Sequence, residues 1–201
     1  MDLSDYIHAV EDGYREVGLG SGVGFPRENL WIAGDESERN GGGHLKAGAK
    51  ASFKFKAALL PGLGGAGVQA YTVGLHTGLE TYMFLFDTTD GSLAAIIEVL
   101  YYDWLKTAAV SAVATRYLAP PNSSIVALIG TGRHARSQLY LLAEVCPIQR
   151  VQAYSRTPET RNDFCEKMSS ELGIEVLPVD SPTSALIDAD IVTTITNSPT
   201  P

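Results

Sequence analysis

The sequence has little cysteine, little positive charge and no cluster of metal ligands. Its 201 residues include two cysteines, Cys146 and Cys165, without metal-ligand spacing around them, and four histidines scattered along the chain. This pattern argues against a disulfide framework and a metal site, and it predicts free thiols. Lysine and arginine number 15 against 23 acidic residues, a net charge of −8, so a nucleic-acid-binding function is disfavoured.

The sequence also lacks a long apolar run. No stretch is long enough to span a bilayer, and the first residues, Met1 to Asp5, lack the basic and apolar regions of a signal peptide. We therefore expect a cytoplasmic protein without a membrane partner. Hydrophobic residues make up 45% of the chain, which suffices for one large domain or two small ones.

A glycine turn between a strand and a helix is the most informative feature that is present. The apolar run 125–129 leads into Gly130-Thr-Gly132-Arg-His-Ala135, and a helical pattern follows directly. In a dinucleotide-binding unit the first glycine makes the tight turn, and the second lets the backbone approach the pyrophosphate. Alanine at the third position keeps helix and strand close, while the helix N-terminus faces the phosphates. This order favours a nucleotide site over a plain turn.

The residues after the next strand favour NADP(H) over NAD(H). An NAD-preferring site usually has Asp or Glu at the end of this strand, 150–154, to bind the ribose 2′-hydroxyl. Here the sequence reads Ser155-Arg156-Thr157, which offers a guanidinium and two hydroxyls to a 2′-phosphate and no carboxylate to repel it. The alternative interpretation is that Arg156 is a solvated loop residue before the helix that begins at Pro158.

The first part of the chain has the pattern of a helix followed by strands. Its expected elements are a helix over 2–18, a glycine-rich turn over 18–24, a strand over 30–33, a loop over 34–50, strands over 52–60, 67–75, 81–87 and 93–99, and a helix over 103–118. The turn 87–91 is typical of a hairpin. The double proline Pro120-Pro121 ends the helix and marks the expected domain boundary.

The remaining residues alternate between strand and helix, which is typical of a doubly wound parallel sheet. The expected strands are 125–129, 151–154, 174–177 and 190–195, and the expected helices are 133–145, 158–172 and 182–188. The fold class is therefore α/β, with an N-terminal α+β domain over 1–120 and an incomplete Rossmann-type domain over 121–201. Because this sheet is short for its architecture, we expect a fragment or a truncated product.

Two adjoining stretches resemble one protein family. The helix Leu105-Lys-Thr-Ala-Ala-Val-Ser-Ala-Val-Ala-Thr-Arg-Tyr-Leu-Ala119 and the glycine turn with Gln138 are similar to the most specific region of the ornithine cyclodeaminase/mu-crystallin family. Further similar pieces are Pro26-Arg27, Phe55-Lys-Ala-Ala58, Thr81 with Leu85-Phe-Asp87 and Gly91, Ala189-Asp-Ile-Val192 and Thr196. The resemblance covers nearly the whole chain, which lacks a short first strand and the C-terminal third of the family.

This resemblance implies a function. Family members are homodimers in which the N-terminal domain supplies the substrate pocket and the dimer contacts. They transfer a hydride between a nicotinamide and an amine or imine carbon, as cyclodeaminases, imine reductases and amino-acid dehydrogenases. The implied partners are NADP, with NAD as the alternative, and an amino acid or cyclic imine. Such chemistry needs a cation for the substrate carboxylate and an acid/base group near the amine.

The resemblance also assigns roles to single residues. Arg27 corresponds to the family's carboxylate-binding arginine, and Lys106 stands where a second such arginine is usual, which keeps the charge but loses the bidentate fork. Gln69 stands in place of the catalytic lysine, and an amide cannot exchange a proton near neutral pH. Lys56, from a neighbouring strand, is a candidate replacement. The aspartate used for cyclodeamination lies beyond Pro201 in the family, so ornithine cyclisation is not expected of this chain.

Each assignment has a structural alternative. Arg27 fits a turn residue with a surface ion pair, Lys56 an outward-facing cation, and Lys106 a solvated helix residue; Thr81 is equally a packing residue of a strand. For His134 we expect backbone contacts. The full set of predicted cofactor contacts is Thr81, Thr107, Gly130, Thr131, Gly132, Arg133, His134, Ala135, Ser155, Arg156, Thr157 and Thr196.

Two functions from different classes stay open at this point. The first is an NADP(H)-linked oxidoreductase of imines or amino acids. The second is a non-catalytic, crystallin-like protein that binds NADP(H) but has a decayed active site. Gln69 and Lys106 favour the second, whereas the intact glycine turn fits both. Hydride transfer by the full-length product separates them.

Overall fold

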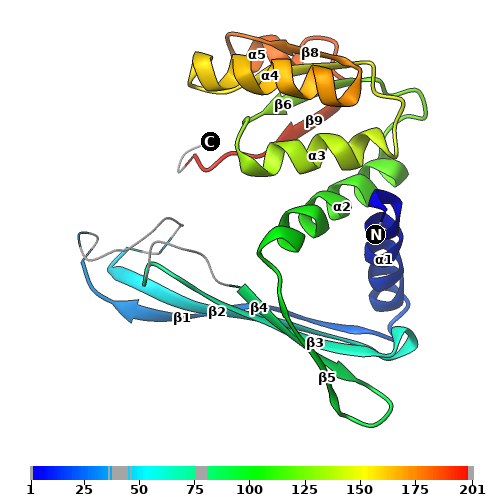
Figure 1. The fold of residues 1–201 in the computed structure, drawn as a ribbon, viewed down its shortest axis with the longest axis vertical. Helices are drawn as coiled ribbons and strands as arrows, with labels where there is room; N and C mark the ends of the chain where they lie inside the picture. Colours follow the sequence, from blue (N-terminus) through cyan, green and yellow to red (C-terminus); the bar gives the residue numbers. More distant parts are fainter. Residues whose placement is uncertain (1, 36, 38–44, 46, 76–80, 199–201) are drawn as a thin grey trace. The chain divides into compact units, whose positions relative to one another are not determined.

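The structure is a computed structural model of the chain, and it describes residues 2–35, 37, 45, 47–75 and 81–198. The polypeptide forms two compact units (Figure 1). One comprises Asp12–Asp103, and the other combines Met1–Glu11 with Trp104–Pro201. The N-terminal domain predicted over 1–120 and the Rossmann-type domain predicted over 121–201 stay predictions.

The first unit is built on a five-stranded antiparallel sheet. Its strands follow one another in space as they do in sequence, which requires only hairpin connections. They are β1 (Val23–Ala33), β2 (Ala49–Leu60), β3 (Gly65–Val73), β4 (Thr81–Asp87) and β5 (Leu93–Glu98). The hairpin between β4 and β5 was predicted, with Gly91 in the left-handed conformation that its turn requires.

The first strand differs from the prediction. We expected a glycine-rich turn up to Gly24 and a strand over 30–33, but β1 begins at Val23. Pro26 lies within it, where the register against β2 shifts between Phe25 and Glu28. Because β1 is an edge strand, a proline in a bulge interrupts its ladder on one side only. Much of the predicted loop 34–50 lies outside the described residues, and β2 already begins at Ala49.

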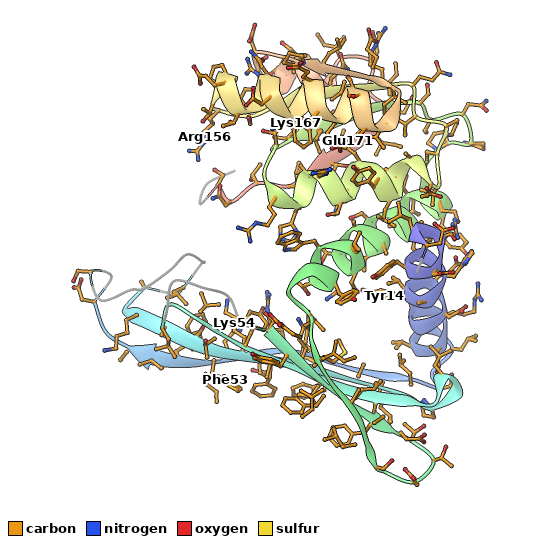
Figure 2. All side chains as sticks on the ribbon, in the orientation of Figure 1. Tyr14, Phe53, Lys54, Arg156, Lys167 and Glu171 are labelled. Carbon is orange, nitrogen blue, oxygen red and sulfur yellow. The ribbon has the colours of Figure 1, made fainter. Side chains whose placement is uncertain are left out.

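The two faces of this sheet differ in chemistry. Side chains alternate along each strand, so Phe53 and Lys54 point to opposite sides of β2 (Figure 2). We call the side of Phe53 the apolar face; by register it carries Val23, Phe25, Leu30, Phe53, Phe55, Phe84 and Ile96. The side of Lys54 is the polar face, which carries Asn29, Lys54, Lys56, Gln69, Tyr71 and Thr81.

The second unit contains a four-stranded parallel sheet in the order β8-β7-β6-β9. Its elements are β6 (Ile125–Ile129), α3 (Arg133–Ala143), β7 (Arg150–Tyr154), α4 (Pro158–Leu172), β8 (Glu175–Pro178), α5 (Pro182–Leu186) and β9 (Ile191–Thr194). The helices α3 and α4 lie on one face of the sheet, where Arg136 of α3 pairs with Glu171 of α4 at 2.6 Å, and α5 packs against the other face, where Gln152 of β7 donates to the Ala185 carbonyl (Figure 1). The strand order reverses after β8, as in the doubly wound dinucleotide-binding fold, so the predicted fold class is confirmed.

Two longer helices complete the chain. They are α1 (Leu3–Gly18) and α2 (Leu100–Leu118), which begins three residues before the predicted 103. In the second unit, the fully buried Ala108 and Ala112 of α2 pack with Ile7 of α1 and Leu141 of α3. Small residues let these helix backbones approach closely, and the contact anchors α3 at the end away from its glycine turn.

Neither a membrane span nor a metal cluster is found in the described ranges. The helices there are too short or too polar to cross a bilayer. No group of three histidine, cysteine or acidic side chains among the described residues is placed to hold a metal ion. Two of the four histidines, His44 and His76, lie outside those residues.

Candidate cofactor and substrate sites

The predicted nucleotide-binding residues gather at one edge of the parallel sheet. The strands β6, β7 and β9 run in the same direction, so their C-terminal ends lie together, followed by Gly130, Ser155 and Thr196. Backbone hydrogen bonds extend the sheet into these turns, since the Gly130 N–H donates to the Tyr154 carbonyl at 2.8 Å. This edge is where doubly wound sheets bind their ligands.

The two glycines of the turn have different physical roles. Gly130 has φ +109°, and a Cβ there would overlap the carbonyl of Ile195, so the turn requires glycine. Gly132 has an ordinary φ of −79°, and a Cβ there would meet nothing within 4 Å. The fold therefore does not need glycine at 132. Open space beside a bare backbone is what close approach of a pyrophosphate requires.

The N-terminus of α3 is prepared for an anion. Its N-cap, Gly132, has no side chain, so no side chain caps the first backbone amides, and the helix dipole adds partial positive charge. Ala135 is fully buried, and its small side chain lets α3 pack closely on the sheet.

Arg133 and His134 pack around one indole ring at this helix end. The Arg133 guanidinium carbon lies 4.9 Å from the centroid of the Trp104 ring. The His134 ring meets the same indole edge to face, with 5.9 Å between the centroids. Its Nδ1 is buried and has no hydrogen-bond partner within the described part of the chain. The imidazole is thus held mainly by packing against Trp104.

The loop after β7 carries the residues predicted to bind a 2′-phosphate. Thr131 Oγ1 donates to Ser155 Oγ at 2.8 Å, which links this loop to the glycine turn. Arg156 is exposed, and we find no side-chain partner for it among the described residues (Figure 2). Thr157 is the N-cap of α4 but makes no side-chain capping bond, so its hydroxyl is available to a ligand. These observations leave the alternative of a solvated Arg156 in place.

Sequence reasoning missed Arg161, which supports this loop from behind. Although it is only 6% exposed, its guanidinium donates to the Ser155 carbonyl at 3.3 Å and to Asp180 at 2.8 Å. A signal was present, because Arg161, Cys165 and Met168 follow the helical spacing of the buried side of α4. A buried arginine requires hydrogen-bond or ion-pair partners. Here they are the Ser155 carbonyl in the loop after β7 and Asp180 in the connection between β8 and α5.

On the polar face of the antiparallel sheet, the predicted catalytic candidates lie side by side. Lys56 and Gln69 are direct cross-strand partners on β2 and β3. Both reach one oxygen of Asp103, which lies 3.9 Å from Lys56 Nζ and 3.3 Å from Gln69 Nε2. Gln69 is buried and donates a hydrogen bond, whereas Lys56 supplies a group that can carry a proton next to a carboxylate.

Arg27 approaches Lys54 on the same face. Arg27 lies in the bulge of β1, between the paired residues Phe25 and Glu28. Burial and the positive charge of Arg27 lower the pKa of Lys54. Lys54 was not predicted, although the alternation Phe53-Lys54-Phe55-Lys56 places it beside Lys56.

The other predicted residues are divided between the two units. Thr81 is buried at the start of β4 on the polar face, opposite Tyr71. Lys106 and Thr107 are half-buried in the second unit, in the turn of α2 that follows Trp104. Asp103, which joins Lys56 and Gln69, had no signal in the sequence beyond its place near a helix start.

With this geometry established, comparisons with known proteins identify the family. The profile of the ornithine cyclodeaminase/mu-crystallin family matches residues 58–201. The chain belongs to this family. The match spans the strands β3 and β4, the helix α2 and the whole parallel sheet, so it covers the glycine turn, Gln69 and Asp103, whereas Arg27, Lys54 and Lys56 lie before its first residue.

Individual relatives in the family are enzymes of imine chemistry. The chain is 34% identical over 119 residues to a Delta(1)-pyrroline-2-carboxylate reductase of Bacillus cereus, covering 59% of this chain and 37% of the relative. It is 33% identical over 122 residues to the ketimine reductase mu-crystallin of Rattus norvegicus, covering 61% and 38%. The chain therefore aligns with well under half the length of these curated relatives.

A solved structure reproduces the fold over almost the entire chain. The Delta(1)-pyrroline-2-carboxylate reductase of Thermococcus litoralis, in complex with NADH and L-proline, superposes with a TM-score of 0.80 at 25% identity. The superposition covers 96% of this chain and 58% of that one. Family membership and fold thus agree with the resemblance seen in the sequence.

Proposed function

We propose that this chain belongs to a nicotinamide-dependent oxidoreductase that acts on an amino acid or cyclic imine. The observation that supports this most is the edge of the parallel sheet, where a strained Gly130, an open Gly132 and an uncapped α3 form a cradle for a pyrophosphate. The relatives described above reduce ketimines and pyrroline-2-carboxylate, and one binds NADH.

The cofactor we propose is NADP(H). Arg156 and the hydroxyls of Ser155 and Thr157 offer donors to a 2′-phosphate at the end of β7. No acidic side chain follows β7 directly to prefer a ribose hydroxyl. The predicted contacts of Gly130 to Ala135, Thr81, Thr107 and Thr196 are part of the same proposal.

The test is a titration of the purified chain with NADPH and with NADH, followed by nicotinamide fluorescence. We expect tighter binding of NADPH. Arg156→Ala should weaken NADPH binding by roughly 1.5–3 kcal/mol, as for a charged hydrogen bond, and leave NADH nearly unchanged. Equal losses for both cofactors would reject the role of Arg156, and no binding of either would reject the nucleotide site.

We propose that Arg27 and Lys106 bind the substrate carboxylate. Lys56 is the group that donates or accepts the proton of the substrate nitrogen. The chemistry that the cofactor supplies when bound is hydride transfer to or from the carbon of the amine or imine. Lys56 Nζ donates a proton to the substrate nitrogen, or accepts one in the reverse direction. Asp103 holds the ammonium in place, and Gln69 orients Asp103 from the neighbouring strand.

Gln69 is also the observation that favours the second candidate, a crystallin-like NADP(H)-binding protein without catalysis. Gln69→Lys separates the two, measured as NADPH oxidation with Delta(1)-pyrroline-2-carboxylate. Turnover that appears only in this variant indicates a decayed site. Turnover in the unaltered chain shows that the proton group lies elsewhere than position 69, as proposed for Lys56.

We further propose a homodimer formed through the apolar face of the antiparallel sheet. Leu30 and Ile96 of this face are 61% and 60% exposed, and Phe25 stacks on Phe55 beside them. An apolar patch of this kind on a single chain is typical of a protein–protein interface. We also propose a cytoplasmic location.

A further inference from the structure

The charges on the polar face are not balanced within the part of the chain that the structure describes. Lys56 has Asp103 as an ion-pair partner. The side chains of Arg27 and Lys54 have neither an ion-pair nor a hydrogen-bond partner there. Arg27 belongs to the bulge of β1 that lies opposite Lys56, and Lys54 lies two residues along β2 on the same face. Burial and the charge of Arg27 accordingly lower the pKa of Lys54. Two neighbouring cations therefore have no counter-charge among the described residues.

The strand register shows why no acid compensates Lys54. Its direct cross-strand neighbours on this face are Asn29 of β1 and Tyr71 of β3, which are neutral groups able to donate hydrogen bonds. The nearest acid on β1, Glu28, pairs with Phe55 and so belongs to the apolar face. The surroundings of Lys54 thus offer donors and positive charge, which is the chemistry of an anion site.

The charge of one substrate carboxylate does not balance this pair. A carboxylate on Arg27 neutralises one positive charge and leaves a partly buried ammonium beside it. An unpaired charge in such a place is costly, and a second anion removes that cost. Lys54 also lies two residues from Lys56 on the same face, about 7 Å along the strand, a separation that a short carbon chain spans.

We infer that the polar face selects an amino or imino acid with two acidic groups, and that Lys54, beside Arg27, is the residue that recognises the second one. This inference rests on the proposed function, in which Arg27 binds the first carboxylate. It narrows the substrate class from amino acids in general to acidic ones.

The experiment compares two probes of nearly equal shape that differ by one charge, succinate and monomethyl succinate. Binding to the full chain is followed by tryptophan fluorescence, because Trp31 lies on the same face, opposite Ser52. We expect succinate to bind about tenfold more tightly, as for one charged hydrogen bond. Lys54→Gln should abolish this preference and Lys54→Arg should retain it. Equal binding of both probes by the unaltered chain would overturn the inference.

Lys167→Gln is the matched control, because it removes one lysine charge from α4, in the parallel-sheet unit (Figure 2). It should leave the preference for succinate unchanged, and a loss there would show that net charge alone is responsible. NADPH titration of the same variants separates the two proposals. If Lys54→Gln loses the succinate preference but binds NADPH normally, the inference stands; if no form binds NADPH, the proposed function fails independently of the succinate result.

Discussion

The two sheets of this chain present functional groups in different ways. In the parallel sheet, the candidate groups lie at one edge and are mostly backbone: the turn at Gly130 and the amides at the start of α3. In the antiparallel sheet, they lie on one face and are side chains brought together by register, such as Lys56 opposite Gln69. An edge of backbone amides suits a ligand part common to many enzymes, whereas a face of side chains is easily varied to suit one substrate.

The sheets also differ in how their apolar surface is covered. The parallel sheet is buried by its own helices, with Val126, Leu128 and Val151 fully inaccessible. The antiparallel sheet leaves large side chains of its apolar face exposed, including Leu30 and Ile96. The parallel sheet is thus covered by helices of its own unit, whereas the antiparallel sheet leaves an apolar face exposed in the single chain.

The largest expected effect concerns the side-chain site. Lys56→Met should lower turnover of Delta(1)-pyrroline-2-carboxylate by roughly 10²–10⁴-fold, the usual contribution of general acid–base catalysis. NADPH binding should stay within about twofold, because Lys56 belongs to the other unit. Steady-state kinetics over a range of pH measure both the rate and the loss of an ionisation. A variant with unchanged turnover and pH profile would remove Lys56 from the mechanism.

Alanine substitutions at the two glycines of the turn should have different effects, one on stability and the other on NADPH binding. Gly130→Ala should destabilise the parallel-sheet unit by about 2–4 kcal/mol, because it combines a left-handed φ with an overlap on Ile195. Gly132→Ala should change stability by less than about 1 kcal/mol and yet weaken NADPH binding at least about tenfold. Thermal unfolding and cofactor titration report the two effects. Normal NADPH affinity in Gly132→Ala would mean that the open space is not the cofactor site.

A charge introduced on the apolar face should disrupt dimer formation and leave the folding of the chain intact. Leu30→Glu, at an exposed position of the edge strand β1, should shift the chain from dimer to monomer while changing monomer stability by less than about 1 kcal/mol. Leu118→Glu is the control, since Leu118 is 82% exposed on α2, outside the sheet. Sedimentation velocity compares the three proteins. Dissociation by both variants, or by neither, would place the interface elsewhere.

The smallest expected effects appear in alkaline solution and have opposite signs in the two units. Burial raises the pKa of Cys165 from 9.0 to about 11, so the folded state keeps the proton longer and stability falls as the pH rises through this range. The pKa of Lys54 is lowered from 10.5, so the unfolded state binds more protons and stability rises with pH just below 10.5.

The measurement is denaturant unfolding of single variants from pH 8 to 11. Cys165→Ala should remove the alkaline loss, which is at most about 3 kcal/mol at about 1.4 kcal/mol per pKa unit. Arg27→Gln should reduce the rise attributed to Lys54, because it removes one cause of the lowered pKa. An unchanged alkaline loss in Cys165→Ala would show that the thiol does not account for it.

Much of the fold could be predicted because local patterns and tertiary structure agree. The strands 81–87 and 125–129 and the helix 158–172 have the predicted bounds, since each combines a clear period with a turn signal or proline at its end. The early start of β1 could not be predicted from its glycines and Pro26. Only pairing with β2 stabilises an extended conformation there.

The candidate sites were predictable to different degrees. The cofactor turn is contiguous in sequence, so its glycines carry a local signature. The polar face combines residues from β1, β2, β3 and the start of α2, and its members Lys54 and Asp103 were not predicted. Strand register and the return of the chain at Asp103 bring them together, and neither leaves a local pattern.

The sequence by itself determined the family, the order of strands and helices, and the position of the glycine turn, because these depend on periodicity and on steric demands of single residues. Only the tertiary structure decided that Lys56 and Gln69 share one oxygen of Asp103, that Arg27 stands beside Lys54, and that Arg161 supports the loop of Arg156. The physical reason is that charge interactions depend on distance in space, and residues far apart in sequence acquire that distance only when the sheets form.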